Sequence, residues 1–249
     1  MDALNEYLPL SVEGKKILIT GGTTGIGRAA ALLLARLGAH VMIAGLDGQH
    51  LEDALKDLHK DAKGQVYGVI ADLSTEEGIN TLFSAVDGNF DKLDILVNNA
   101  ALSAGNVEDG SYTEWQRVVS TNLMSYIACS AEALERMEGD GHIVNVGSMS
   151  ADVREETGTV YVATKSGIQG FSEALRKEVN KSGIKVTLIE PGAVDTDMQE
   201  QSTEEKLKKI EALEMLTADD IAMSVLYCLS QPKRCDVVEL KVRPHLQVI

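Results

Sequence analysis

The chain has 249 residues, of which 44% are apolar and 24% charged, an ordinary globular composition that can bury a large core. Its formal net charge is -15, and a field of that sign repels nucleic-acid phosphates and anionic lipid surfaces. The composition therefore argues against nucleic acid and against a membrane surface as partners.

Cysteine and histidine spacing gives no sign of a disulfide framework or a metal site. The three cysteines form no Cys-x-x-Cys pair, which fits a reducing compartment. The five histidines (His40, His50, His59, His142 and His245) show no ligand spacing, so no metal is expected. The first eleven residues do not resemble an export signal, and no apolar run approaches the roughly 20 residues that span a bilayer. We expect a cytoplasmic protein.

Short apolar runs alternate with longer amphipathic stretches, a pattern typical of strand–helix units that build a parallel sheet. Strands are predicted at residues 16–20, 40–44, 65–71, 93–98, 142–146, 184–190 and 236–242. Helices are predicted at residues 25–37, 49–59, 75–86, 113–137, 161–180, 203–215 and 218–230. Ser74 and Thr217 are each followed three residues later by an acid, which predicts two capped helix starts.

Several of the strands carry consecutive apolar residues, as in Ile17-Leu18-Ile19, which indicates a sheet covered on both faces. No linker interrupts the chain. The predicted fold is therefore α/β: one Rossmann-like domain over residues 1–249, with a doubly wound parallel sheet of seven strands and helices on both faces.

A glycine-rich turn, Gly21-Gly22-Thr23-Thr24-Gly25-Ile26-Gly27, joins the first strand to the first helix. Glycine tolerates positive φ and the close approach of a ligand, and a helix N-terminus attracts a pyrophosphate. In the first strand–helix unit of a doubly wound sheet, this pattern predicts a dinucleotide site. A P-loop is the nearest alternative, but Arg28-Ala29 stands where that loop needs Lys and Ser or Thr.

Tyr161 and Lys165 are four residues apart in a helical stretch, so their side chains share one helix face. A nearby ammonium stabilises a phenolate and lowers the pKa of a tyrosine from about 10, which predicts an acid/base pair. Ser148 follows an apolar strand at a carboxyl edge, where open α/β sheets bind ligands. These three side chains are the candidate catalytic groups.

Taken in chain order, these motifs resemble the compact branch of the short-chain dehydrogenase/reductase family over almost the whole length of the chain. The family's Thr-Gly-x-x-x-Gly-x-Gly matches Thr20 to Gly27, and its Asn-Asn-Ala-Gly matches Asn98-Asn99-Ala100-Ala101. Its catalytic asparagine, serine and Tyr-x-x-x-Lys match Asn122, Ser148 and Tyr161 with Lys165. Further matches are Asp72 with Leu73, Pro191-Gly192, Val194 and Thr196.

The resemblance implies roles for these residues. Tyr161 would donate a proton to a carbonyl oxygen that Ser148 polarises, Lys165 would hold the nicotinamide ribose, and Asn122 would position a water. NAD(P)(H) would be the cofactor. Together with Asp47, discussed next, its expected contacts are Gly21, Thr23, Thr24, Gly25, Ile26, Gly27, Asp72, Leu73, Asn98, Ala100, Tyr161, Lys165, Pro191, Gly192, Val194 and Thr196. Family members of this size also imply a homotetramer, formed through helices 113–137 and 161–180.

The end of the second strand departs from the family pattern. The family's NAD-selecting Asp falls at Gly45 and its NADP-selecting Arg at Leu46, so neither selector is present. Asp47 is placed to reach a ribose and to repel a phosphate, which favours NAD(H). Arg28, Thr23 and Thr24 offer a weaker phosphate site, and the C-terminal part resembles a subgroup that acts on small hydroxy acids and aldehydes and mostly uses NADP.

The substrate should be contacted by residues 101–106, 149–160 and 193–215, with 193–216 acting as a lid. The charged residues Asp152, Arg154, Glu155 and Glu156 indicate a small polar substrate. The predicted function is a hydride transfer between the nicotinamide and a carbonyl or secondary alcohol carbon. Two alternatives remain: a non-catalytic NAD(P)-binding sensor, and a sugar-nucleotide epimerase or dehydratase, whose relatives have longer chains and a different glycine spacing.

Overall fold

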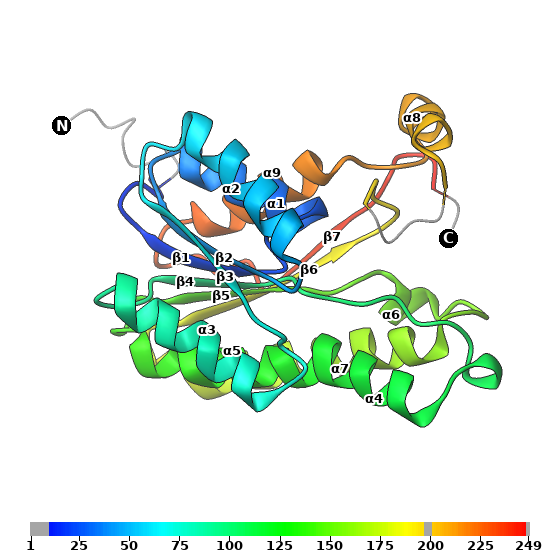
Figure 1. The fold of residues 1–249 in the computed structure, drawn as a ribbon, viewed down its shortest axis with the longest axis horizontal. Helices are drawn as coiled ribbons and strands as arrows, with labels where there is room; N and C mark the ends of the chain where they lie inside the picture. The colour runs from blue at the N-terminus through cyan, green and yellow to red at the C-terminus, as the bar shows by residue number, and fades with distance from the viewer. Residues whose placement is uncertain (1–9, 197–200, 248–249) are drawn as a thin grey trace.

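A parallel sheet between two layers of helices forms the body of the molecule in the computed structural model, which describes residues 10–196 and 201–247 (Figure 1). The sheet has seven strands in the order β3-β2-β1-β4-β5-β6-β7. All neighbouring strands are parallel. The strands are β1 (Lys16–Thr20), β2 (His40–Gly45), β3 (Val66–Ile70), β4 (Ile95–Asn98), β5 (His142–Val146), β6 (Lys185–Pro191) and β7 (Glu239–Val242).

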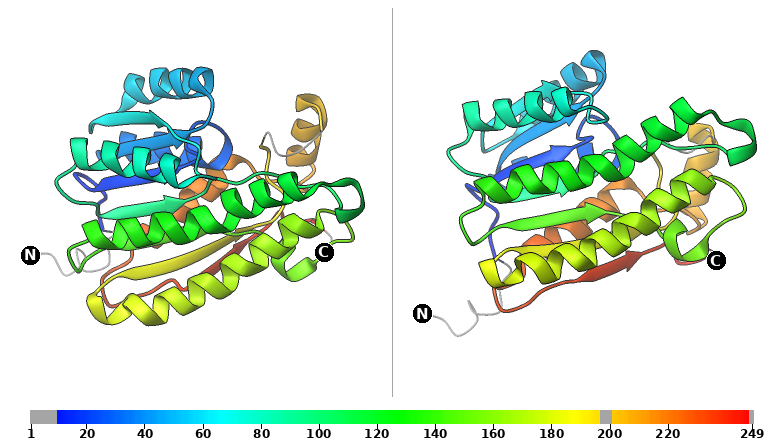
Figure 2. Two further views of the ribbon diagram at one scale, coloured as in Figure 1. Left: turned by 60° about the horizontal axis from the view of Figure 1, so that its bottom comes forward. Right: turned by 90° about the horizontal axis from the view of Figure 1, so that it is seen from below.

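The helices divide between the two faces of this sheet (Figures 1 and 2). One face is covered by α1 (Gly25–Arg36), α2 (Gly48–Asp61) and α9 (Ala218–Leu229). The other is covered by α3 (Glu76–Asn89), α4 (Tyr112–Val119), α5 (Ser125–Arg136) and α7 (Thr159–Val179). The short helices α6 (Ser150–Val153) and α8 (Thr203–Glu211) lie beyond the carboxyl ends of the strands.

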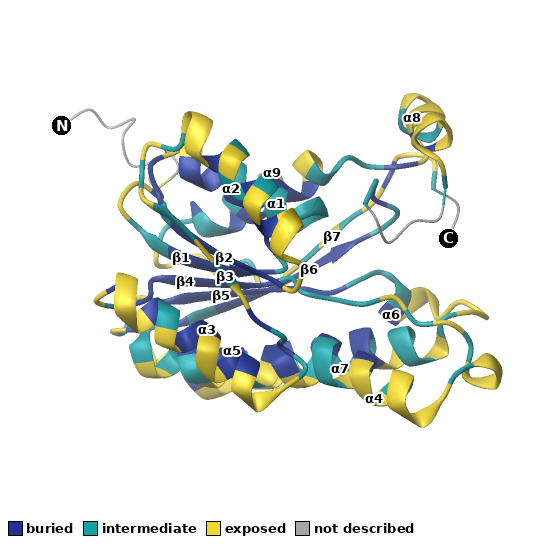
Figure 3. Ribbon diagram, viewed as in Figure 1, coloured by how far each residue is buried: buried dark blue, intermediate teal, exposed yellow. Residues whose placement is uncertain are grey.

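Each sheet face has its own apolar core, and β1 shows why the strands have consecutive apolar residues. Ile17 and Ile19 pack under α1, whereas Leu18 between them packs on the opposite side with α3 and α5. All three are fully buried. Successive strand residues point to opposite faces, so both must be apolar when helices cover both. Figure 3 shows the buried sheet and the exposed outer sides of the helices.

The predicted fold class is confirmed, and the differences lie at element ends. The helix predicted at 113–137 contains a π-helical turn, Ser120–Met124, between α4 and α5. The strand predicted from residue 236 begins only at Glu239. The helix predicted at 203–215 ends at Glu211, because Leu213 takes a positive φ of 62°. A further helix, α6, was not predicted.

The two expected helix caps have different outcomes. Thr217 and Asp220 form the predicted capping box at the start of α9. At α3 the cap is Thr75, whose hydroxyl accepts from the amide of Gly78 at 3.0 Å, and the prediction of Ser74 was wrong. Ser74 instead donates its hydroxyl to Asp72 at 2.7 Å. No helix in the described part of the chain has the length and apolar character to cross a membrane.

His142, the first residue of β5, gives the fold a specific pH dependence. Its ring lies 2.8 Å from the Thr187 hydroxyl, and burial, aided by the nearby Lys185, lowers the pKa of His142 to about 3. The unfolded chain binds a proton below a pH of about 6.5 while the folded protein does not, so stability should fall as the pH drops through this window. Denaturant unfolding at pH 7 and pH 5 should show a loss of about 2 kcal/mol from this group.

The matched comparison is between His142→Gln and His59→Gln, because His59 is exposed. His142→Gln should reduce the pH dependence by about that amount, and His59→Gln should leave it as in the parent protein. An equal pH dependence in all three proteins would show that His142 does not titrate in this way.

Candidate functional site

A cavity of about 720 Å³ opens at the carboxyl ends of the central strands. Its walls come from the segments that follow β1, β2, β3, β4, β5 and β6, together with the start of α7. The strand order reverses between β1 and β4, and this is the point at which open α/β sheets bind ligands. The cavity is therefore the candidate site.

The glycine-rich turn forms one end of this cavity. Gly21 has a φ of 62°, which a side chain would strain, and a Cβ at Gly27 would collide with the carbonyl oxygen of Gly21. The backbone can therefore pass closely from β1 into α1. Thr24, the residue before α1, makes no side-chain capping bond within the described structure, so its helix N-terminus faces the cavity uncapped. Such a cradle fits a pyrophosphate.

Asn99 ties the glycine turn to the loop after β4. Its side-chain amide donates to the carbonyl oxygens of Thr20 at 3.1 Å and Gly21 at 3.0 Å. The Thr20 hydroxyl in return accepts from the backbone amides of Asn99 at 3.0 Å and Ala100 at 3.2 Å. The Asn-Asn-Ala motif contains Asn99, but no role for its side chain was predicted from the sequence.

Asn98, by contrast, points its side chain into the protein. It is fully buried, and its amide donates to Ser130 Oγ at 3.1 Å and to Asn145 Oδ1 at 3.0 Å. The Asn98 side chain does not line the cavity. Side chains alternate along a strand, and Asn98 is still the last residue of β4, so its side chain faces away from the cavity. A cofactor contact from Asn98 stays a prediction.

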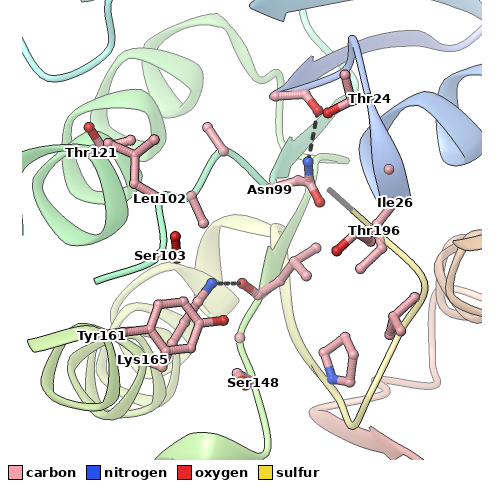
Figure 4. Close-up of a pocket in the computed structure, with 18 of the residues that line it drawn as sticks. Thr24, Ile26, Asn99, Leu102, Ser103, Thr121, Ser148, Tyr161, Lys165 and Thr196 are labelled. Carbon is pink, nitrogen blue, oxygen red and sulfur yellow. Dashed lines mark hydrogen bonds between the residues drawn. The ribbon is translucent and has the colours of Figure 1, made fainter. Parts of the chain in front are cut away.

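Tyr161, Lys165 and Ser148 meet at the floor of the cavity, as the sequence predicted (Figure 4). Tyr161 and Lys165 project from the first turns of α7, and Ser148 lies on the segment after β5. Lys165 Nζ is 5.6 Å from the centre of the Tyr161 ring. The same Nζ donates to the carbonyl oxygen of Val146 at 2.9 Å, which fixes the ammonium at the end of β5.

The protonation of this pair is governed by burial. Lys165 is only 2% exposed, and loss of water lowers its pKa to about 7. Burial also raises the pKa of Tyr161, while the Ser148 hydroxyl lowers it and the charge of Glu155 raises it. The expected lowering of the Tyr161 pKa by Lys165 is therefore not seen, and burial of the phenol is the largest effect on it.

Asn122 lies in the π-helical turn, behind the cavity wall. Its Oδ1 accepts from the backbone amide of Leu102 at 2.7 Å, and its Nδ2 donates to the Leu102 carbonyl at 2.8 Å and to Thr164 Oγ1 at 3.3 Å. A π turn often marks a functional position, and here it turns the amide toward the loop after β4. The side chain clamps that loop to α7.

Tyr126 is a buried neighbour of the site that the sequence analysis missed. It is fully buried on α5, and its hydroxyl donates to the carbonyl oxygen of Val146 at 3.1 Å. Its ring centre lies 5.6 Å from Lys165 Nζ, within range of a cation–π interaction. Only its position on a buried helix face was predictable.

Asp47 stands after β2, at the same end of the cavity as the glycine turn. Its carboxylate accepts from the amide of His50 at 2.8 Å and so caps α2. The space that a side chain at Gly45 would occupy is filled by Thr23. Arg28 is paired with Asp57 on α2 and does not line the cavity, so the suggested phosphate contact from Arg28 was wrong.

Most of the residues predicted to hold a cofactor lie together on the cavity wall. Gly27 and Asn98 are behind it, as is the predicted catalytic Asn122. Those that line the cavity are Gly21, Thr23, Thr24, Gly25, Ile26, Asp47, Asp72, Leu73, Ala100, Tyr161, Lys165, Pro191, Gly192, Val194 and Thr196.

Of the four charged residues thought to contact substrate, only Glu155 lines the cavity. The Ser150 hydroxyl donates to it at 3.2 Å. Asp152 turns away to bind Lys241 at 2.5 Å, and Arg154 donates to the carbonyl oxygen of Ala151 at 3.3 Å. The loop therefore presents one negative charge to the cavity.

The segment predicted as a lid is described only in part, because residues 197–200 lie outside the described ranges. Lys206 of α8 is buried and donates to the carbonyl oxygen of Thr196 at 2.7 Å. Leu207 on the same helix is 54% exposed. Helix α8 therefore turns a lysine toward the protein and a leucine toward solvent.

Over the residues described, no group of three His, Cys, Asp or Glu side chains is arranged to hold a metal ion.

Comparison with known proteins identifies the family. A family model described as short chain dehydrogenase matches residues 15–207. The chain belongs to the short-chain dehydrogenases. An uncharacterized oxidoreductase of Staphylococcus aureus is 34% identical over 233 residues, covering 92% of this chain and 97% of that protein. One of Staphylococcus epidermidis is 33% identical over 236 residues, covering 94% and 98%.

Solved structures agree on the short-chain dehydrogenase fold. L-sorbose reductase from Gluconobacter frateurii, complexed with NADPH and L-sorbose, superposes with a TM-score of 0.86 at 22% identity, covering 95% of this chain and 98% of that one. A short-chain dehydrogenase from Burkholderia cenocepacia in complex with NADP gives 0.84 at 26% identity, covering 94% and 98%. The chain is thus an oxidoreductase of the short-chain type.

Proposed function

We propose that this protein transfers a hydride between NAD(P)(H) and the carbonyl or secondary alcohol carbon of a small polar substrate, with Tyr161 as the acid/base. The observation that carries the proposal is the meeting of Tyr161, Lys165 and Ser148 at the floor of a cavity whose far end is the glycine turn. A nearly buried ammonium, that of Lys165, beside the phenol of Tyr161 is not needed in a purely structural set of polar residues, so it indicates a functional site.

The residues on the cavity wall fit a nicotinamide dinucleotide. The uncapped N-terminus of α1 and the positive-φ turn at Gly21 suit a pyrophosphate, and Asp72 and Leu73 lie on the same wall after β3. The nicotinamide supplies or accepts the hydride when it is bound. We assign to Lys165, on the cavity floor, the role of holding its ribose.

In the reductive direction, Tyr161 donates its phenolic proton to the substrate oxygen while Ser148 donates a hydrogen bond to the same oxygen. The raised pKa of Tyr161 keeps the phenol protonated before the reaction, as a general acid requires. Lys165 in its ammonium form stabilises the phenolate that remains. Asn122 holds Leu102 in place at the mouth of the pocket with both atoms of its side-chain amide. We propose that it also positions a water that relays protons to Lys165.

Substitution of Tyr161 by Phe tests this assignment. Loss of the proton donor should lower kcat/KM by a factor of about 10² to 10⁴ in a screen of ketones and aldehydes with both reduced cofactors. Cofactor binding should change by less than about threefold, since the ring remains. The matched control is Tyr67→Phe, on the far side of the sheet from α1.

Tyr161→Phe with the turnover of the parent protein would refute the role of the phenol. If the parent protein binds a dinucleotide but oxidises it with none of the substrates, the sensor becomes the better description.

Asp47 is proposed to discriminate between the two cofactors, and its carboxylate on the cavity rim favours NAD(H) by repelling a 2′-phosphate. The neighbours that contain NADP or NADPH do not support that preference, so the contribution of Asp47 itself is what needs measuring. Asp47→Asn keeps the helix cap, because Asn and Asp cap equally well.

In Asp47→Asn, the dissociation constant for NADPH relative to that for NADH should fall by about tenfold, equivalent to roughly 1.4 kcal/mol of removed repulsion. Titration calorimetry with both cofactors provides the ratio. A ratio equal to that of the parent protein would place the discrimination elsewhere.

The charge of Glu155 indicates which polar substrates are accepted. Glu155 lines the cavity from the segment between α6 and α7, so a substrate carboxylate beside it would be repelled. The other Asp, Lys and Arg side chains on the described cavity wall are Lys165 on the floor, Asp47 and Asp72 after β2 and β3, and Arg117, whose charge acts on Asp72. Neutral and cationic carbonyl compounds are therefore favoured over keto acids. This differs from the hydroxy-acid preference implied by the C-terminal resemblance.

A matched series of a keto acid, its amide and an amino ketone tests the charge preference. Glu155→Gln should raise kcat/KM for the keto acid relative to the amide by about tenfold. Glu156→Gln is the control, because Glu156 is adjacent and does not line the cavity. The same ratio in both variants would count against Glu155 as the selector.

A further inference from the structure

A second buried charge lies directly behind the site. Glu190 is in β6 immediately before Pro191, and its side chain is 0% exposed. It sits against the backbone that carries Ser148, since a Cβ at Gly147 would be 3.2 Å from Glu190 Cγ. A carboxylate taken out of water needs compensating partners, or it costs stability. The chemistry proposed above makes no use of it.

The partners of Glu190 are incomplete. Its Oε1 accepts from Gln169 Nε2 at 2.9 Å, while Oε2 has no hydrogen bond among the described residues and faces Lys241 Nζ at 3.7 Å. Burial is the largest influence on the pKa of Glu190 and raises it, as do the charges of Asp152 and Glu239, while Gln169 and Lys241 lower it. A buried polar atom left in this state calls for a functional explanation.

Lys241 of β7 links this carboxylate to the surface. It is 41% exposed and also binds Asp152 of α6 at 2.5 Å and Glu239 at 3.0 Å. These three carboxylates raise the pKa of Lys241, so it carries a full positive charge at neutral pH. Asp152 further accepts from Gln169 at 3.1 Å, which closes the group around α6, α7, β6 and β7.

A buried cation, Lys165, lies on the same helix as Gln169. It lies one turn before Gln169 on α7, so the two side chains share a helix face. No carboxylate of the described chain is within ion-pair distance of Lys165 Nζ. Burial lowers the pKa of Lys165, and Glu190 is the group whose charge raises it again.

We propose that Glu190, held ionised by Lys241, is a positioning residue that keeps Lys165 in its ammonium form. The other groups that face Glu190 are Gln169 from α7, Asp152 from α6 and Glu239 from β7. Lys241 contacts all three carboxylates, but Asp152 and Glu239 are exposed, so water screens their charges, whereas Glu190 is buried and its charge is screened less. The functional consequence rests on the proposed hydride transfer, in which Lys165 acts as the cation.

The variant Glu190→Gln removes the charge and keeps the shape. We expect the Lys165 ammonium to lose its proton at a pH lower by about one unit, the size expected of one charge at an effective dielectric of about 20. Carbon-13 NMR titration of the lysine ε-carbons in the cofactor-free protein measures this directly, with Lys165→Met identifying the signal. The alkaline limb of the reductive kcat profile should move to lower pH by the same amount.

Two further variants separate charge from packing. Lys241→Met leaves every buried side chain intact, so it remains informative if Glu190→Gln does not fold. It should let Glu190 take up a proton and shift the Lys165 titration in the same direction, with no additional shift in the double variant. Glu239→Gln removes a different partner of Lys241 and should leave the titration within about 0.3 units of the parent value.

An unshifted Lys165 titration in both Glu190→Gln and Lys241→Met overturns the proposal, as does a kcat profile that is lowered at every pH without a shift. A shifted titration in a protein that turns over no substrate supports the inference and counts against the proposed reaction. The two ideas can therefore fail separately.

Discussion

All seven strands run in the same direction, so their carboxyl ends lie along one edge of the sheet. A parallel connection has to return over a face of the sheet, and each strand is therefore followed by a loop at that edge before its helix begins. The connection after β1 crosses one face of the sheet and the connection after β4 crosses the other. The loops that follow these two neighbouring strands therefore separate, and the cavity lies between them. The glycine turn, Asn99, Ser148 and the start of α7 come together through this one constraint.

The cavity has a polar floor inside an otherwise apolar body, and Lys165 is the floor residue most destabilised by this. Burial removes water from its ammonium group and lowers the pKa of Lys165 to about 7. The surrounding polar groups, among them the Val146 carbonyl and the ring of Tyr126, offset part of it. Functional residues of enzymes commonly carry such a penalty, because a group adjusted for proton transfer is not adjusted for stability.

The sequence was sufficient for the order of elements and for the candidate catalytic residues, because hydrophobic periodicity and motif spacing are local signals. It was insufficient where the direction of a side chain matters. Asn98 and Asn99 are adjacent and chemically identical, yet one faces the core and the other the glycine turn. Arg28 and Lys206 found partners on other elements, Asp57 and Thr196, that no local pattern specifies. The π turn at Asn122 depends in the same way on a distant loop, at Leu102.

The carbonyl of Val146 receives two donors, one from Lys165 on α7 and one from Tyr126 on α5. This acceptor belongs to the main chain, so it remains when the side chain of the same residue is replaced. The residue type at position 146 can thus change as core packing allows, while the hydrogen bonds from both helices to its carbonyl oxygen are kept. Only a change in the path of the backbone at the end of β5 would detach them, which makes this junction tolerant of point substitutions and sensitive to insertions or deletions.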